Sequence, residues 1–359
     1  MLNFKNKQKM KRLLNLGWSV LLMAFIFASC NSDDDLNLPK AMKGNFVLNE
    51  SSSITLIQHD GTVTQNYFES VNKVALGKYP QSMLLTNEYG FIVVTESGKP
   101  GYVEVVTAAD FKHYETIKDL KYPREVAANG NKLYISTGNG ADKAKGHIVV
   151  VDLKTMKKTN SIEVGAGPEK LIINGNYLYV ANSGGWSNDD NTISVIDLAT
   201  EKVVKTYTVK MCPKDMVLDA DNNLWVFCGG KPDYSNYPNV TYADPGISKV
   251  NTNTGNVVSW DIVNKTAGLK NIAITKDRKT IYFMTDGVYS VNYKANKLPT
   301  EKILPDTYYG ININPKTGNI WVCKSNGTDP GMVIVYTKSG DKVTEYTTGA
   351  FPNETIFSY

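Results

Sequence analysis

The chain has few of the residues on which acid–base and metal chemistry usually depend. Its 359 residues include 3 histidines and 4 cysteines, and none of the patterns G-x-S-x-G, H-E-x-x-H or a paired-cysteine metal signature occurs. His59, His113 and His147 all fall on or beside predicted third or outer strands. A lyase or hydrolase that uses histidine as acid or base is therefore disfavoured. We predict that the protein is not an enzyme and has no catalytic residues, no cofactor and no metal site.

Positive charge is also scarce outside the first 29 residues. The formal net charge is +4, but residues 1–29 hold five basic residues and no acidic one, which leaves 34 basic against 35 acidic residues. The body of the chain thus lacks the basic surface of a nucleic-acid-binding protein. Its composition, 42% hydrophobic and 21% charged, is typical of a folded chain with a large core.

The amino terminus has the pattern of an export signal. A basic start is followed by the apolar run 13–28, which is too short and wrongly flanked for a membrane span. Small residues before Cys30 resemble a lipobox, and the acidic run 33–35 resembles a surface-export signal of some Gram-negative lipoproteins. We expect a signal peptide (residues 1–29), a tether (30–43) lipidated at Cys30, and a lipid-anchored protein on the outer face of the outer membrane. Ordinary signal cleavage and a periplasmic location are the alternatives.

From residue 44 onwards the chain repeats itself. An anchor residue, usually proline, opens an apolar strand in each repeat, and the anchors are Pro80, Pro123, Pro168, Pro213, Leu269, Gly310 and Pro352. Successive anchors are 41 to 45 residues apart, except for one interval of 56 residues. This spacing is typical of the four-stranded blades of a β-propeller.

Each end of the repeat array holds only part of one repeat. The segment 352–359 has room for a single strand, whereas 44–79 has room for three, at residues 45–48, 54–59 and 63–68. Together they make one repeat. The sequence therefore predicts an all-β, seven-bladed propeller over residues 44–359, closed when the C-terminal strand joins the N-terminal blade.

The strand openings and the loops between second and third strands of a propeller gather on one face around the central channel, where we expect the site. The long interval of 56 residues places an extra loop, residues 229–246, on this face. Aromatic rings there offer contact area, while polar and charged groups fix a ligand's orientation. Alternatively, individual tyrosines only fill strands or the channel. The predicted ligand-binding residues are Tyr79, Tyr122, Arg124, Glu169, Trp186, Lys214, Tyr234, Tyr237, Tyr308 and Phe351.

Two cysteines lie near one end of a single predicted blade. Cys212 precedes its first strand and Cys228 closes its second. A disulfide is permitted in an exported protein, and two small buried thiols are the alternative.

The run Tyr-Leu-Tyr-Val-Ala-Asn at residues 177–182, followed by Thr-Ile-Ser-Val-Ile-Asp at 192–197, resembles the YVTN-type propeller repeat. With the leader, Gly-Asn-Phe-Val-Leu-Asn-Glu at 44–50 and the segment 309–318, the chain is similar to seven-bladed surface lipoproteins that include the BtuG-type cobalamin-binding proteins. This resemblance implies capture of cobalamin or a related corrinoid, as ligand and not as cofactor, for an outer-membrane transporter. The alternative is a non-catalytic scaffold that binds a partner protein or glycan at the outer membrane.

Overall fold

The computed structural model describes residues 42–138, 144–263 and 270–359. The predicted signal peptide, Cys30, most of the predicted tether and the anchor Leu269 lie outside the described residues. None of the helices in the described part is long and apolar enough to cross a membrane.

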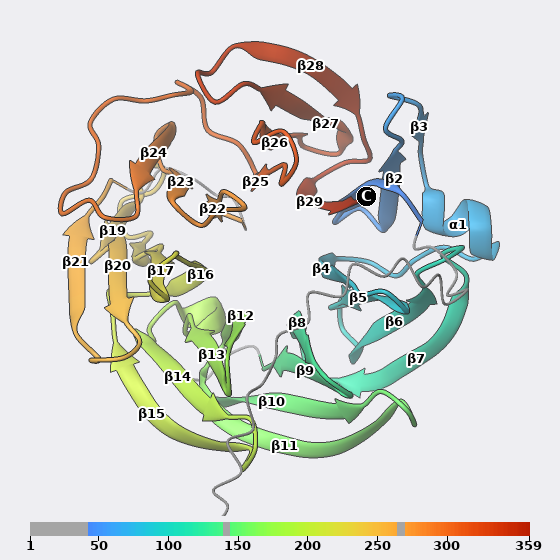
Figure 1. Ribbon diagram of the computed structural model, residues 1–359, viewed down its shortest axis with the longest axis horizontal. Coiled ribbons are helices and arrows are strands. Elements are labelled where there is room, and N and C mark those ends of the chain that lie inside the picture. The colour runs from blue at the N-terminus through green and yellow to red at the C-terminus, as the bar shows by residue number, and fades with distance from the viewer. Residues whose placement is uncertain (1–41, 139–143, 264–269) are drawn as a thin grey trace, which may run out of the picture. The chain divides into compact units, whose positions relative to one another are not determined.

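Seven antiparallel sheets, or blades, surround a central axis in the described part of the chain (Figure 1). Blade 1 is built from both ends of the chain: β29 (Pro352–Ser358), β1 (Gly44–Asn49), β2 (Ser53–Ile57) and β3 (Val63–Thr64). β29 pairs with β1 from Gly44↔Ser358 to Asn49↔Pro352, with a bulge at Leu48 and Asn49. The prediction of a seven-bladed propeller closed by its C-terminal strand is confirmed.

The other blades follow the chain. Blade 2 comprises β4 (Pro80–Leu85), β5 (Tyr89–Val94), β6 (Gly101–Thr107) and β7 (His113–Leu120). Blade 3 comprises β8 (Pro123–Asn129), β9 (Lys132–Thr137), β10 (Lys145–Asp152) and β11 (Lys157–Ala166). Blade 4 comprises β12 (Pro168–Asn174), β13 (Tyr177–Asn182), β14 (Thr192–Asp197) and β15 (Lys202–Thr208).

Blade 5 comprises β16 (Pro213–Leu218), β17 (Asn223–Cys228), β20 (Gly246–Asn251) and β21 (Val257–Asp261), with the hairpin β18 (Lys231–Asp233) and β19 (Thr241–Ala243) inserted between β17 and β20. Blade 6 has the three strands β22 (Ile272–Ile274), β23 (Thr280–Met284) and β24 (Val288–Asn292), and a bridge between Val288 and Leu304 takes the place of a fourth. Blade 7 comprises β25 (Gly310–Ile313), β26 (Ile320–Asn326), β27 (Asp329–Tyr336) and β28 (Lys342–Thr347).

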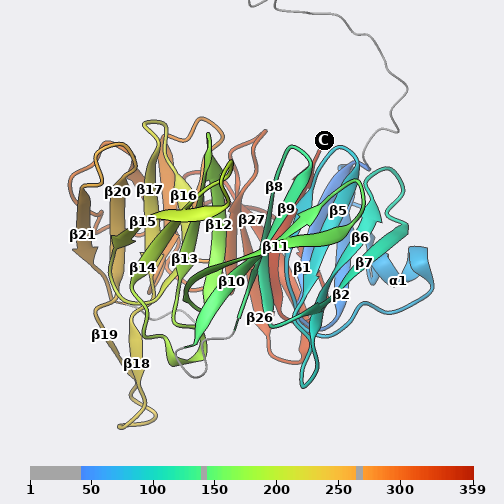
Figure 2. The ribbon, with the colours of Figure 1, turned by 90° about the horizontal axis from the view of Figure 1, so that it is seen from below.

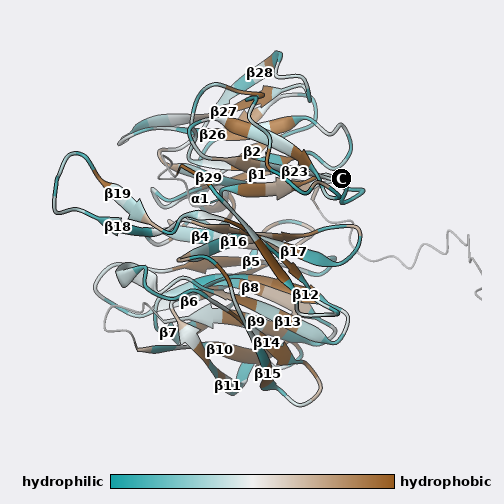
Figure 3. Cartoon of the chain, turned by 90° about the vertical axis from the view of Figure 1, so that its left-hand side faces the viewer, coloured by the Kyte–Doolittle hydropathy of each residue, from teal (hydrophilic) through white to brown (hydrophobic). Residues whose placement is uncertain are grey.

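The inner strands are apolar on both faces because each blade packs between two others. In β13, Leu178 and Val180 pack in a cluster with residues of blade 3, whereas Tyr179 and Ala181 pack with residues of blade 5. This alternation follows from the two-residue period of a strand. Outer strands are more exposed and more polar: none of the residues of β28 is buried, and the strand is mostly hydrophilic (Figure 3).

Blade 1 corrects the predicted fourth strand at residues 63–68. β3 ends at Thr64, and Tyr67 and Phe68 begin the helix α1 (Tyr67–Asn72). A strand would send these two rings to opposite faces, whereas the helix buries both in one cluster with Phe46 and Phe111. Just before β1, the backbone N–H of Met42 donates to the Ala108 carbonyl at 2.7 Å.

Candidate functional site

Five inner strands begin at a proline that follows a left-handed residue. The prolines open β4, β8, β12, β16 and β29, and the preceding residues, with φ between 47° and 60°, are Tyr79, Tyr122, Gly167, Cys212 and Phe351. Four of these five residues are not glycine, so their backbone is strained. Strain of this kind concentrates at functional sites, and it marks the ends of the strands around the channel.

A pocket of about 620 Å³ lies at this end of the channel, lined by residues of blades 1 to 5. We refer to it as the mouth pocket. Six of the ten predicted ligand-binding residues line it: Tyr79, Tyr122, Arg124, Glu169, Trp186 and Lys214. The lining also includes residues outside the predicted set, chiefly Glu50, Gln81, Glu96 and Asn188.

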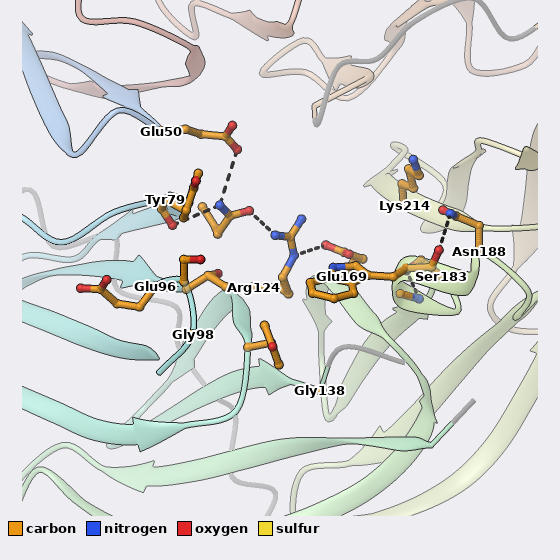
Figure 4. A pocket seen from close by; sticks show the side chains of 16 residues that line it. Glu50, Tyr79, Glu96, Gly98, Arg124, Gly138, Glu169, Ser183, Asn188 and Lys214 are labelled. Atoms are coloured by element: carbon orange, nitrogen blue, oxygen red, sulfur yellow. Dashed lines mark hydrogen bonds and ion pairs between the residues drawn. The ribbon is translucent and has the colours of Figure 1, made fainter. Parts of the chain in front are cut away.

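Arg124 is at the centre of a hydrogen-bonded series, which we call the arginine chain (Figure 4). Its Nε donates to Glu169 Oε2 at 2.9 Å, and its Nη1 donates to Gln81 Oε1. Gln81 Nε2 in turn lies 3.5 Å from Glu50 Oε1, and the Tyr309 hydroxyl donates to Glu50 Oε2 at 2.7 Å. Side chains from blades 7, 1, 2, 3 and 4 are thus joined across the mouth.

The repeat explains this arrangement. Gln81, Arg124, Glu169 and Lys214 each directly follow the opening proline of their strand. Equivalent positions in neighbouring blades lie side by side around the channel, so four residues distant in sequence become neighbours.

Burial shifts the pKa values of the residues in the arginine chain. It raises the pKa of Glu50, and the hydrogen bond from Tyr309 and the charge of Arg124 oppose this only in part. Burial and the adjacent Glu50 raise the pKa of Tyr309 above its usual range. Burial lowers the pKa of Arg124, but Glu169 more than compensates, so the guanidinium stays charged.

An aromatic wall stands beside the arginine chain. Trp186 lies in the short helix η1 (Gly185–Ser187) and is 70% exposed, and its ring meets that of Tyr122 edge-on at 5.5 Å. The loop that carries Trp186 packs directly on Gly167, where a Cβ would lie 2.0 Å from the backbone nitrogen of Gly185. Tyr79, 46% exposed, stands on the other side of the pocket. Exposed rings at a pocket offer stacking surface to a flat ligand.

Tyr234 and Tyr237 do not line the mouth pocket. They lie between β18 and β19, in a hairpin that projects from the propeller (Figure 2), and they are 63% and 79% exposed. The hairpin replaces the loop between second and third strands, so it rises from the face that carries the pocket. Lys231 Nζ, 3.9 Å from Asp189 Oδ2, links it to the loop of Trp186.

The structure corrects the placement of Tyr308. Its side chain is 7% exposed in the core, with its hydroxyl 3.2 Å from that of Tyr336, and the next residue, Tyr309, reaches the mouth instead. Phe351 is half-buried beside Tyr309, their ring centroids 6.2 Å apart, and is not part of the lining.

The histidines and described cysteines lie outside the mouth pocket. Cys212, Cys228 and Cys323 are free and buried, so of the two alternatives for Cys212 and Cys228 the structure has the buried thiols. No group of three or more histidine, cysteine or acidic residues in the described ranges is arranged to hold a metal ion.

Deeper in the channel, a second layer of charged residues is paired. Lys270 Nζ lies 2.7 Å from Glu125 Oε2, across the channel, and 3.9 Å from Glu354 Oε2. Lys170 Nζ lies 3.0 Å from Glu125 Oε1, and Asp215 Oδ2 accepts hydrogen bonds from the backbone N–H groups of residues 271 and 272. We call these five residues the channel cluster.

Fold and site together define a seven-bladed β-propeller with a polar, aromatic-walled pocket at one mouth of its channel. The chain belongs to the family of the domain of unknown function DUF5074, whose model matches residues 43–358. Comparison with curated proteins gives no match.

Solved structures with the same fold cover nearly all of the propeller. Hydrazine synthase of Kuenenia stuttgartiensis is 16% identical with a TM-score of 0.62, covering 89% of this chain and 99% of that one. A protein from Lactobacillus plantarum is 12% identical with a TM-score of 0.63, and the match covers 89% of this chain and 100% of that one. The periplasmic gluconolactonase PpgL of Pseudomonas aeruginosa is also 12% identical, with a TM-score of 0.62, and the match covers 88% of this chain and 99% of that one. At these identities the likeness concerns the fold alone.

Proposed function

We propose that the protein is a surface-anchored binding protein that captures a nutrient in the mouth pocket and passes it to an outer-membrane transporter. The observation that carries this proposal is the pairing of exposed rings, at Trp186 and Tyr79, with a preassembled arginine chain. Rings supply contact area at little entropic cost, and fixed polar groups orient what they hold. The mechanism is equilibrium binding without bond making.

A corrinoid is the proposed ligand, by the resemblance to cobalamin-binding surface lipoproteins. A corrin ring is broad and its edge carries amides, which suits a pocket lined by indole and phenol rings together with carboxylate and amide groups. Lipidation at Cys30 would hold the protein at the outer membrane beside its transporter.

The test is calorimetry of the protein lacking residues 1–30 with cyanocobalamin. We expect saturable binding at micromolar concentration or tighter, and a loss of about tenfold or more in Trp186→Ala, since a stacked ring contributes about 1–3 kcal/mol. Tyr177→Ala is the matched control, because Tyr177 is also exposed but opens β13, away from the pocket. Absence of binding at micromolar concentration rules out this ligand.

The projecting hairpin favours a second candidate, a scaffold that docks a partner protein. Tyr234 and Tyr237 are its exposed aromatic side chains, and neither lines the mouth pocket. For this candidate, the protein would co-purify with an outer-membrane transporter, and Tyr234→Ala with Tyr237→Ala would abolish co-purification while cyanocobalamin affinity stayed unchanged. Co-purification that survives both substitutions argues against the hairpin as the docking site.

A further inference from the structure

Among the residues that the structure describes, the mouth pocket contains one ammonium group without a protein partner. Of the basic residues that line it, Arg124 is engaged by Glu169 and Gln81. Lys214 makes no hydrogen bond or ion pair with any residue in the part of the chain that the structure describes. Figure 4 shows its side chain on the other side of Arg124 from Glu50, without a contact to the residues drawn.

The lysines of the channel cluster, unlike Lys214, are paired with acidic residues. Lys170 and Lys270 are both paired with Glu125, at 3.0 and 2.7 Å. The three acids of the mouth pocket are likewise engaged: Glu169 is bound to Arg124, Glu96 lies 3.4 Å from Lys99, and Glu50 accepts hydrogen bonds from Gln81 and Tyr309. The positive charge of Lys214 is therefore the one that the pocket leaves uncompensated among its described lysine and arginine residues.

The backbone at Lys214 is firmly held. Pro213 before it is buried, and Asp215 after it accepts two backbone hydrogen bonds, at 2.9 and 3.2 Å, from blade 6. The ladder between β16 and β17 shifts register between Pro213 and Asp215, so Lys214 lies at a bulge, and its side chain lines the mouth pocket while Asp215 is buried. A charged side chain on a fixed strand end is a preorganised binding group.

We propose that Lys214 is the anion-recognition residue of the mouth pocket, so that the ligand carries a phosphate- or carboxylate-type group beside Lys214 and a flat ring system beside Trp186. The inference rests on the proposed function in assuming that this pocket binds a ligand. Arg124 does not take this role, because Glu169 and Gln81 already use its Nε and Nη1 donors. A lysine ammonium, with three donors and a compact charge, suits a single anionic oxygen group.

The anion site is testable without knowing the ligand, through iodide quenching of tryptophan fluorescence. The protein without residues 1–30 has four tryptophans: Trp186 is 70% exposed, Trp260 is half-buried, and Trp225 and Trp321 are buried, so Trp186 is the one most accessible to solute quenchers. We expect Lys214→Met to lower the iodide Stern–Volmer constant about twofold at low ionic strength, because a local positive charge concentrates iodide. Lys214→Arg should restore it, and quenching by neutral acrylamide should not change.

Lys205→Met is the matched control, since it removes one positive charge from the outer strand β15. An iodide constant that is equal in the wild type, Lys214→Met and Lys205→Met overturns the anion site.

A second experiment compares the affinities for cyanocobalamin and for dicyanocobinamide, which lacks the phosphodiester of the nucleotide loop. We expect Lys214→Met to weaken cyanocobalamin binding about tenfold and dicyanocobinamide binding hardly at all, since only the former offers the charge. Equal losses for both, or none for either, contradict the role of Lys214. If neither corrinoid binds the wild type while iodide quenching responds to Lys214, the anion site stands and the corrinoid proposal fails.

Discussion

Bulky residues in left-handed conformation frame the mouth of the channel. Tyr79, Tyr122 and Phe351 precede opening prolines with φ of 60°, 47° and 52°. Glycine would adopt this conformation more easily, yet among the five described residues that precede an opening proline it is present only in blade 4, at Gly167. The reason lies in the loop of Trp186, whose backbone occupies the space that a side chain at Gly167 would need.

At this scale we predict that Gly167→Ala lowers the free energy of unfolding and displaces Trp186. Its Cβ would lie 2.0 Å from the Gly185 nitrogen, so the cost exceeds the roughly 1–2 kcal/mol of a left-handed alanine alone. Gly175→Ala is the control, because Gly175 has a similar φ of 58° and nothing within 4 Å of the added Cβ. Urea denaturation of both variants measures the difference, and equal losses would show that the loop does not pack as described.

At the scale of elements, the channel cluster joins strands that no backbone ladder connects. Lys270, from the segment before β22, is buried between Glu125 of β8 and Glu354 of β29, so blades 6, 3 and 1 are linked through side chains alone. Removing one member of such a group leaves an uncompensated buried charge.

We predict that Lys270→Met lowers the free energy of unfolding by about 3–5 kcal/mol, the usual cost of breaking a buried pair from one side. Lys294→Met serves as control, because Lys294 pairs with Asp221 at 3.2 Å on the surface, where the loss should stay below about 1 kcal/mol. Chemical denaturation compares the two. Similar small losses would mean that the cluster contributes little to closing the ring.

Glu354 gives the cluster a pH dependence. Its burial raises its pKa above the ordinary 4.5, so the folded protein binds this proton more tightly than the unfolded chain. Its contribution to stability is therefore full below pH 4.5 and is lost as pH rises through the folded pKa. Asp215, also raised by burial, acts in the same sense, whereas Lys170 and Lys270 hold the pKa of Glu125 below its usual range despite burial, so Glu125 acts in the opposite sense.

The corresponding variant is Glu354→Gln, which keeps the shape and removes the titration. We predict that the free energy of unfolding of the wild type, minus that of this variant, falls as pH rises above 4.5. Chemical denaturation of both proteins at a series of pH values measures this difference. A difference that is constant, or that grows with pH, contradicts a raised pKa at Glu354.

At the scale of the whole molecule, the sequence repeat made the propeller fold predictable. The incomplete repeats at the two ends of the chain made the closure of the ring predictable. The proline anchors and the strand composition specify blades, and the single strand left after Pro352 specifies β29 in blade 1. What the repeat could not indicate are the departures from it. Helix α1 depends on packing against Phe46 and Phe111, which belong to other blades or strands, and the missing fourth strand of blade 6 depends on how the segment around Leu304 covers Val288.

The same distinction applies to the site. Arg124, Glu169 and Lys214 were predictable because each follows an anchor proline. Gln81 shares this position but is not among the predicted ligand-binding residues, so the anchor proline was the signal that could have identified it. Glu50 was missed because it follows β1, in the blade assembled from two chain ends. Tyr309, not the predicted Tyr308, directly precedes the anchor Gly310, which is the position that Tyr79 and Tyr122 hold in front of their prolines.

The central claim, that the mouth pocket binds a flat ligand at its aromatic wall, is tested most directly by hydrogen–deuterium exchange of the protein lacking residues 1–30, with and without saturating cyanocobalamin. The account predicts slower exchange in peptides covering residues 79–82, 122–125 and 183–191, because bound ligand and ordered loops reduce local opening there. It predicts no change in the outer strands β7, β11 and β15. Protection confined to outer strands, or to the opposite end of the channel, would contradict it.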